Sequence, residues 1–286
     1  MMKRSLLFLL YLVAPEELAC HAEALREGRV VQWEIIIPSY NNEKWCIQNI
    51  ESVVNQTYPH WHATVIVDCA TDNTEDLLRE YITTHQLHDK ITLQVNKRNK
   101  GALANIYYAA TACDPEKVIG LLDGDDWFKH DRVLEHVTQV YQEEDVWMTY
   151  GQFELWPEDR IGHCRPYPKE IIKNNSFRYV QGVLPSHFRT FYAWLFQLID
   201  KKDLLHKGKF FRVTWDMSIM YPVIEMCGEH HKCISEVLYV YNIANPLNDF
   251  KEHTALQAQL DQFIRSKKRY RPLEKKPHLA KVHHEI

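Results

Sequence analysis

The chain has 286 residues, of which 45% are apolar and 25% are charged, as in an ordinary globular protein. This composition excludes collagen-like, low-complexity and wholly disordered chains. The 34 Lys and Arg against 38 Asp and Glu give a formal net charge of −4, which argues against a protein that binds the nucleic-acid backbone. The seven cysteines are scattered and odd in number, which favours a reduced compartment over a disulfide scaffold.

The N-terminal segment, which we place at residues 1–32, begins with Lys3 and Arg4 before an apolar run over residues 5–14. The run is shorter than the roughly 20 apolar residues that a spanning helix needs. It resembles the start of a signal peptide, but Pro15-Glu16-Glu17 stands where small residues at a cleavage site are expected. Targeting by residues 1–14, anchoring, and an ordinary element of the domain all stay open. We predict a cytoplasmic protein, with membrane association as an option and secretion not excluded.

The C-terminal segment is basic. Residues 265–286 hold eight Lys or Arg and two Glu. Such a composition predicts a solvated tail, and contact with an anionic membrane surface is an alternative. Removing this charge of +6 from the total of −4 leaves −10 for residues 1–264, so the folded body is acidic.

Short β-rich runs alternate with helical stretches in the first half of the chain. We predict strands at 34–37, 63–67, 91–95 and 118–122, and helices at 43–56, after Asp72-Asn73-Thr74, and at 101–112. Nearly continuous apolar strands separated by helices indicate an α/β fold with a mainly parallel sheet flanked by helices. The second half is less regular, with helices predicted at 189–198 and 215–226 and a strand at 236–241.

The turn after the first strand bears on nucleotide binding, since such sheets bind ligands at the carboxyl ends of their strands. Residues 38–42 read Pro-Ser-Tyr-Asn-Asn, without the glycines of a dinucleotide-binding turn. No phosphate-binding Gly-x-x-x-x-Gly-Lys motif occurs either. Dinucleotide oxidoreductases and P-loop enzymes therefore lose their main support.

The sharpest chemical feature is Asp123-Gly124-Asp125, followed by Asp126, at the end of the fourth strand. Side chains at i and i+2 of an extended segment point to the same side. Clustered carboxylates repel one another unless a cation or water neutralises them, and a hard divalent cation shared with substrate phosphates is a common solution. The alternative is an acidic turn in which Asp123 or Asp126 only caps the next helix.

Five segments in order carry a resemblance to a known family. They are residues 36–42, 52–59, 67–74, the Asn99-Lys100-Gly101 stretch with Ala104-Asn105, and 122–126. Residues 33–127 resemble the nucleotide-binding half of glycosyltransferase family 2, inverting enzymes with the GT-A fold. The resemblance implies a GT-A, Rossmann-like sandwich over residues 33–264, with an acceptor and catalytic half at 128–264. It also implies a hexosyltransferase that uses a nucleotide sugar, UDP-linked, with Mn²⁺ or Mg²⁺.

The resemblance also assigns roles to single residues. Pro38, Tyr40 and Asn41 would line the base pocket, Asp68 would bond the uracil, and Asp125 would hold the metal together with Asp123, which also faces the ribose. The residues bordering the nucleotide would be Asn99, Gly101 and Asn105. Where the family has an additional Asp and a Ser around Asp68, this chain has Val67 and Ala70, which leaves the base preference less certain than the fold.

The catalytic half must supply a base, because the acceptor hydroxyl loses a proton as it attacks. The family places an Asp at the start of a helix here, and Asp216 matches that position, although Trp215 stands where Glu is usual. A simple helix cap at Asp216 is the alternative. Arg189 suits an anionic phosphate or an acceptor.

The cluster Cys227, His230, His231 and Cys233 admits three interpretations. A zinc site is one, although its spacing matches no known finger. His230 as a further ligand of the donor metal is the second, and a polar turn is the third. Asn242, Asn245, Asn248 and Asp249 are expected in a loop without an assigned role.

The acceptor class stays open among glycans, lipids and proteins. The sequence lacks the Gln-x-x-Arg-Trp motif and membrane helices of polysaccharide synthases, which favours a single, non-processive transfer. Two other functions are carried as alternatives: a degenerate GT-A domain that binds sugar nucleotide or glycan without turnover, and a nucleotidyltransferase. Nucleic acid is not an expected partner.

Overall fold

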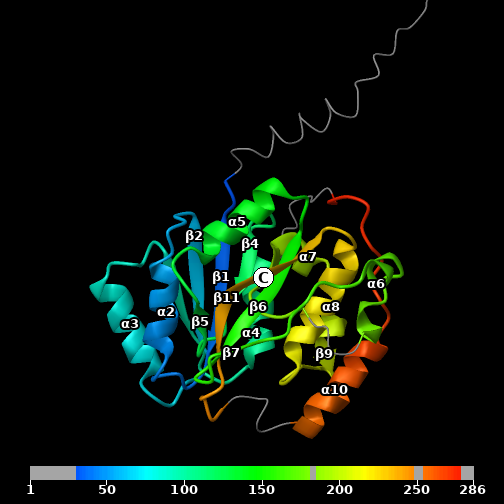
Figure 1. Cartoon of the computed structure of the whole chain (residues 1–286). Helices are drawn as coiled ribbons and strands as arrows, with labels where there is room; N and C mark the ends of the chain where they lie inside the picture. Colours follow the sequence, from blue (N-terminus) through cyan, green and yellow to red (C-terminus); the bar gives the residue numbers. More distant parts are fainter. Residues whose placement is uncertain (1–29, 181–184, 248–253, 278–286) are drawn as a thin grey trace, which may run out of the picture.

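The computed structural model describes residues 30–180, 185–247 and 254–277. Its centre is a nine-stranded sheet in the order β3-β2-β1-β4-β8-β6-β11-β5, with β7 paired to β6. The expectations for residues 1–14 lie outside the described residues. Figure 1 shows β1 near the middle of the molecule, with α2 and α3 on one side and α8 and α10 on the other.

The first half of the sheet is parallel, as the alternating pattern predicts. It consists of β1 (Trp33–Ser39), β2 (Trp61–Val67), β3 (Ile91–Val95) and β4 (Val118–Leu121). Ile35, Ile36 and Ile37 of β1 are fully buried, because a central strand packs against covering layers on both faces. The carboxyl ends of β1 and β4 therefore lie side by side.

The second half adds antiparallel pairings, so the sheet is mixed, although its longer pairings are parallel as predicted. Strand β8 (Arg189–Tyr192) runs antiparallel between β4 and β6 (Met148–Trp156), and β11 (His231–Asn242) runs parallel to β6. The short strands β5 (Trp127–Phe128) and β7 (Arg160–Ile161) complete it.

The helix predicted at 189–198 is wrong in its first four residues, which form β8. All four are buried, so the segment has no exposed face whose periodicity could separate a strand from a helix. The hydroxyl of Thr190 bonds those of Thr149 (2.7 Å) and Tyr141 (2.9 Å), which satisfies it inside the sheet. Within the predicted segment, only α7 (Ala193–Gln197) is helical.

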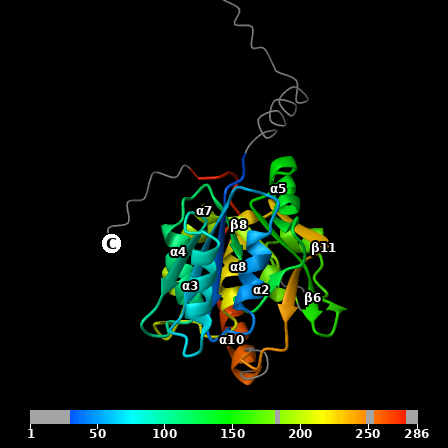
Figure 2. The same ribbon diagram turned by 90° about the vertical axis from the view of Figure 1, so that its left-hand side faces the viewer.

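Helices cover the sheet. They are α2 (Cys46–Val54), α3 (Thr74–Thr84), α4 (Ala102–Ala112), α5 (Val133–Glu143), α6 (Lys169–Lys173), α8 (Trp215–Cys227) and α10 (Thr254–Ser266), with 3-10 turns η1 (Phe177–Tyr179) and η2 (Lys201–Leu204) and the hairpin β9–β10 (Leu205–His206, Lys209–Phe210). Seen from two sides, α5 lies at one end of the molecule and α10 at the other (Figure 1, Figure 2).

Residues 265–277 of the predicted basic tail are held against the folded body by hydrogen bonds, although many of them stay exposed. The backbone N–H of Leu273 donates to Met226 O (2.9 Å), and that of Tyr270 donates to Glu225 Oε2 (3.0 Å). Arg178 bonds both Glu225 oxygens (2.6 and 2.8 Å) and also Ile264 O, so a buried ion pair holds α8 against the end of α10. Residues 278–286 lie outside the described part.

Candidate active site

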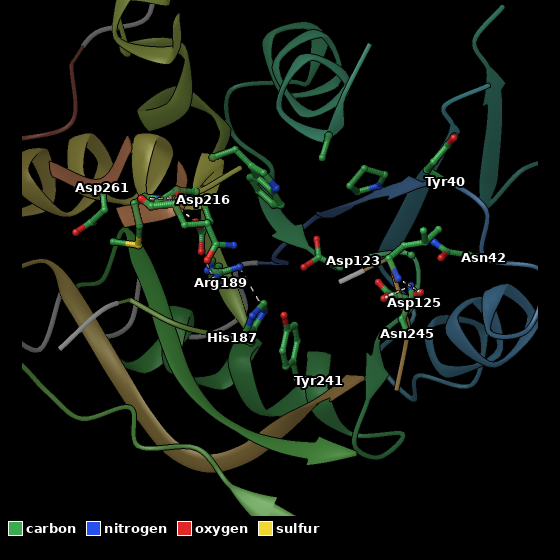
Figure 3. Close-up of a pocket in the computed structure, with 18 of the residues that line it drawn as sticks. Tyr40, Asn42, Asp123, Asp125, His187, Arg189, Asp216, Tyr241, Asn245 and Asp261 are labelled. Atoms are coloured by element: carbon green, nitrogen blue, oxygen red, sulfur yellow. Dashed lines mark hydrogen bonds and ion pairs between the residues drawn. The ribbon is translucent and has the colours of Figure 1, made fainter. Parts of the chain in front are cut away.

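A cleft of about 660 Å³ opens at the carboxyl ends of β1 and β4. One wall is formed by the turn after β1 and the Asp-Gly-Asp loop, and the facing wall by the first turn of α8 and by α10. Figure 3 shows the side chains converging on it. Its lining includes Pro38, Tyr40, Asn42, Asp123, Asp125, His187, Arg189, Trp215, Asp216, Tyr241, Asn245, Gln257 and Asp261.

The Asp-Gly-Asp loop is held tightly at the cleft. Asn49 on α2 donates to Asp123 O (2.9 Å) and to Asp126 O (2.7 Å), and the Asp123 N–H donates to Tyr239 Oη (3.1 Å). A Cβ at Gly124 would lie 2.8 Å from Pro38 O, so only glycine lets the loop pack against the end of β1. The glycine in the motif is thus a packing requirement.

Asp125 faces the cleft from this loop. Its Oδ2 accepts a hydrogen bond from Asn245 Nδ2 (2.7 Å), and burial raises the pKa of its carboxyl above the usual value. Asn242 Nδ2, at the end of β11, donates to Asp125 O (3.0 Å), so the end of β11 and the loop after it support both the backbone and the side chain of Asp125. No role for either asparagine is predicted from the sequence.

Asp126 plays a different part, because it is fully buried and does not line the cleft. Its carboxylate accepts from Tyr239 Oη and from the Asn242 N–H, both at 2.7 Å. Burial, together with the nearby charges of Asp125 and Asp123, raises the pKa of Asp126 well above its ordinary range. Asp126 therefore fastens the loop to β11.

The chemistry of this corner suits a divalent cation. Among the described residues, Asp123, Asp126 and His187 bring one ligand atom each within 4.8 Å of one another. His187 is buried, and burial followed by the charge of Arg189 lowers its pKa well below the usual value, which leaves a neutral imidazole able to bind a metal. Carboxylate oxygens with one such nitrogen fit Mn²⁺ or Mg²⁺.

The prediction of His230 as a metal ligand is wrong. His230 precedes β11, whereas the residues that bond Asp125 follow its far end, a dozen residues and roughly 35–40 Å along the strand. Its ring stacks on Trp147 (3.9 Å) and its Nδ1 pairs with Asp145 (3.2 Å). His187 lies beside Asp123 and Asp126 instead. In this stretch of the sequence, only its near neighbour Arg189 is predicted as a site residue.

The zinc interpretation finds no support in the described residues. Cys227 is buried within α8, and His231 Nδ1 bonds Gly228 O (2.6 Å). Cys233 lies beside Cys164, and the Cys233 thiol donates a hydrogen bond to the Cys164 sulfur. The segment is the end of a helix and the start of β11, which begins five residues before the predicted strand.

The turn after β1 presents two of its three predicted residues to the cleft. Pro38 and Tyr40 line it, and the Tyr40 ring is 42% exposed and free to stack on a planar group. Asn41 does not line it: its backbone is left-handed (φ 51°) and its Oδ1 accepts from the Thr71 N–H (2.8 Å). Its neighbour Asn42 takes the lining position, because the left-handed residue turns the chain.

Asp68 directly follows β2 and is buried outside the cleft lining. Its carboxylate accepts from the N–H groups of Lys100 (2.9 Å) and Gly101 (2.7 Å) and from Asn96 Nδ2 (2.8 Å). These partners belong to the loop before α4, so Asp68 fixes that loop. The predicted contact with uracil stays a prediction.

The three residues predicted to border the nucleotide lie around this loop and not in the cleft lining. Asn99 Oδ1 accepts from Arg212 Nη1 (2.5 Å). Gly101 has φ 88° and contacts Arg212, so it needs glycine, and the following Ala102 lines the cleft. Asn105 is buried with Oδ1 bonded to Asn96 (2.8 Å) and Nδ2 without a partner.

The facing wall carries Asp216 in the first turn of α8. Asp216 is the second helical residue, so it is not the helix cap; the cap position is Thr214. Its Oδ1 accepts from the Met217 N–H (2.9 Å) and its Oδ2 from Arg189 Nη2 (2.7 Å). The Asp216 side chain is 27% exposed, so it can still meet a ligand. Figure 3 shows it across the cleft from Asp123.

Further along this wall stand residues that the sequence did not reveal. Trp215 and Tyr241 add aromatic surface, and Gln257 and Asp261 come from α10. No motif marks α10, since its polar residues are ordinary for an exposed helix. Their role follows only from where α10 packs.

Comparison with known proteins places the chain in a family. The model described as "Glycosyl transferase family 2" matches residues 34–200, more than half of the chain, and the chain belongs to this family of glycosyltransferases. The fold is accordingly the predicted α/β GT-A type, and the protein is classed with enzymes. Among the described residues, no helix has the length and apolar character to cross a membrane.

Individual relatives agree. The chain is 28% identical over 125 residues to the putative teichuronic acid biosynthesis glycosyltransferase TuaG of Bacillus subtilis, covering 44% of this chain and 48% of that one. It is 32% identical over 141 residues to the UDP-Glc:alpha-D-GlcNAc-diphosphoundecaprenol beta-1,3-glucosyltransferase WfgD of Escherichia coli, covering 49% and 53%. The chain thus spans about half the length of these relatives.

Solved structures share the fold. TarS 1-349 of S. aureus in complex with UDP superposes with a TM-score of 0.56 at 16% identity, over 74% of this chain and 61% of that one. GalNAc-T7 with UDP, GalNAc and Mn²⁺ gives a TM-score of 0.51 at 12% identity, over 75% and 44%.

Proposed function

We propose that this chain transfers a single sugar from a UDP-sugar to an acceptor hydroxyl, with inversion at the anomeric carbon. The observation that carries the proposal is that Asp123 and Asp125 on one wall and Asp216 on the other line one cleft. Such a cleft offers a cation-binding end for a diphosphate and a carboxylate for the acceptor.

The donor end is the wall formed by β1 and the Asp-Gly-Asp loop. Tyr40 and Pro38 provide the apolar surface for a base, and Asn42 adds a polar group beside Gly124. Asp123 and His187, which form one cluster with the buried Asp126, would hold Mn²⁺ or Mg²⁺ together with Asp125 of the same loop. When bound, the ion would neutralise the charge of the departing diphosphate. The clustered carboxylates of this loop favour a cation because they repel one another without it.

The acceptor end is the wall formed by α8. Asp216 takes the proton of the acceptor hydroxyl while the hydroxyl oxygen bonds the anomeric carbon and the bond to the diphosphate oxygen breaks. Arg189 and the Met217 N–H fix the carboxylate, so one orientation is held before the acceptor arrives. Attack from the face opposite the diphosphate inverts the centre.

For the acceptor we propose a glycan carried on a membrane lipid. The name of WfgD describes a sugar linked to diphosphoundecaprenol. This chain is 32% identical to WfgD over about half of its own length. The aromatic and polar residues of the outer cleft, Trp215, Tyr241 and Asp261, suit sugar rings and hydroxyls.

The test is release and transfer of label from a panel of UDP-sugars with Mn²⁺. Asp125→Ala and Asp216→Asn should lose the activity, whereas Asp159→Asn, a matched change at an exposed turn outside the cleft, should keep it. Full activity in either cleft variant would overturn the mechanism.

A second candidate is a domain that binds sugar nucleotide without turnover. It is supported by Val67 and Ala70 in place of the family's polar residues, and Val67 is fully buried in β2. Calorimetry that shows UDP binding, together with no turnover across the donor panel, would favour this candidate.

A further inference from the structure

A basic and aromatic surface lies beside the cleft, on α4 and the residues just before it, on η2 and on the β9–β10 hairpin. Its members are Lys100, Tyr108, Lys201, Lys207, Lys209 and Phe210, and we call them the basic aromatic surface. Tyr108 is 54% exposed, and all four lysines are exposed. In Figure 1 both elements lie in the half of the molecule that holds α10.

Ring contacts join the two elements into one surface. Tyr107 on α4 lies 5.2 Å from Phe210 on the hairpin, and Tyr108 lies 6.3 Å from the same ring. Lys201 stands over these three rings at 5.0–5.9 Å, and Lys100 stands over Tyr108 at 5.8 Å. The ammonium groups of Lys201 and Lys100 therefore lie over these aromatic rings.

The lysines of this surface lack acidic partners among the described residues. Some lysines elsewhere are paired with an acidic residue, for example Lys129 with Glu154 (2.8 Å), Lys232 with Glu144 (2.7 Å) and Lys276 with Glu116. At the surface itself only the neighbouring Lys202 is paired, with Asp200. A local excess of positive charge on a chain whose net charge is −4 marks a site for an anionic partner.

The surface borders the cleft directly. Arg212, two residues after Phe210, bonds Asn99 and packs against Gly101, and Ala102 then lines the cleft. Three residues beyond Arg212 the chain reaches Trp215 in the cleft wall. Whatever binds the basic aromatic surface therefore lies next to the cleft mouth.

We propose that the basic aromatic surface docks on an anionic lipid bilayer. Tyr rings favour the boundary between headgroups and acyl chains, and lysines around them meet the lipid phosphates. The hairpin tip suits such contact, because nothing lies within 4 Å of a Cβ placed on Gly208. The inference rests on the proposed function only in its purpose, which is to bring the cleft to a lipid-linked acceptor.

The experiment is sedimentation of the full chain with vesicles of phosphatidylglycerol and phosphatidylcholine, against vesicles of phosphatidylcholine alone. We expect binding only to the anionic vesicles. Lys207→Glu/Lys209→Glu should weaken it at least about tenfold, because each surface lysine adds on the order of fivefold. Tyr108→Ser should weaken it further. The matched control Arg132→Glu/Arg160→Glu reverses two exposed charges near β5 and β7 and should bind as the native chain does.

Hydrogen exchange gives a second measurement: the amides of residues 205–210 should slow on anionic vesicles. Unchanged vesicle binding in the Lys207→Glu/Lys209→Glu variant would overturn the proposal. Soluble polyglutamate serves as an anionic polymer for comparison: if the hairpin variants lose binding to it but keep binding to vesicles, the proposal is also overturned. The assay contains neither donor nor acceptor, so a failed transfer reaction and a failed docking surface are told apart. Unchanged thermal unfolding of each variant shows that it folds.

Discussion

Arg189 Nη2 donates to Asp216 Oδ2 at 2.7 Å, which joins the sheet to the first turn of α8 across the floor of the cleft. The two residues are 27 positions apart in the sequence and belong to β8 and α8. Arg189 is almost buried, and it also bonds Pro185 O (3.2 Å) and His187 Nδ1 (3.3 Å). Arg189 thus contacts both Asp216, the proposed base, and His187, which clusters with Asp123 and Asp126.

This contact predicts different results for two substitutions. Asp216→Asn keeps the size and the Met217 contact but cannot take a proton, so kcat should fall about 10²–10⁴-fold with little change in the donor KM. Arg189→Lys keeps the charge but loses the fixed fork of donors, so kcat should fall less. Steady-state kinetics with a saturating donor measures both. Equal kcat for Asp216→Asn and the native chain would rule out this base.

Asp68 should contribute to stability as well as to the site. Its carboxylate accepts from two N–H groups of the loop before α4, and an amide in Asp68→Asn would turn a donor toward one of them. We expect a loss of about 1–3 kcal/mol in the free energy of unfolding, read as a Tm lower by several degrees. A Tm that does not change would mean that the carboxylate does not hold this loop.

The buried pair of Arg178 and Glu225 should show a strong asymmetry between single and double substitutions. Burial raises the pKa of Glu225 above its usual value even with Arg178 beside it. A charged Glu225 carboxylate that loses Arg178 would therefore lower the free energy of unfolding. Arg178→Met should cost about 3–5 kcal/mol at neutral pH, and Arg178→Met/Glu225→Leu should recover much of it.

The pH dependence of Arg178→Met follows from the same shift. A raised folded pKa means that stability is greatest below the ordinary carboxyl pKa and falls as pH rises through the folded value. Urea unfolding at acid and neutral pH checks this sign. A variant that becomes more stable as pH rises would contradict it.

The thiol of Cys164 should be unusually reactive. The hydrogen bond from Cys233, with smaller help from the Ser186 backbone and Arg189, lowers the pKa of Cys164 to about 7, whereas burial raises that of Cys46 to about 11. The alkylation rate at Cys164 should therefore rise through a midpoint near pH 7, because the thiolate is the nucleophile. Peptide mass spectrometry after timed iodoacetamide labelling measures each site. A rate at Cys164 that still climbs steeply above pH 8.5 would refute the shift, and Cys233→Ser should move its midpoint upward.

The sequence predicts the donor half of the fold well because its strands and helices are local and strongly patterned. The Asp-Gly-Asp loop is predicted at the cleft for the same reason, because it follows a strand of the parallel set, whereas the roles of Tyr40 and Asp216 come from the family resemblance. Asn41 was misplaced by one residue, since a left-handed turn is not visible in the residue types around it.

The second half was harder to predict because its residues act through tertiary contacts. The buried run Arg189–Tyr192 has no periodicity, so β8 was read as a helix. His187 reaches the cation corner only because β8 inserts between β4 and β6, and Asn245 only because β11 ends beside the loop. Nothing in one sequence marks these pairings.

The most direct test of the account is calorimetric titration of UDP into the chain with and without Mn²⁺, repeated with Asp123→Ala/Asp125→Ala. UDP binding should strengthen at least about tenfold with Mn²⁺ in the native chain and gain nothing from Mn²⁺ in the variant, because these aspartates would hold the cation that neutralises the diphosphate. Equal UDP affinity with and without the metal, or the same metal effect in the variant, would contradict it.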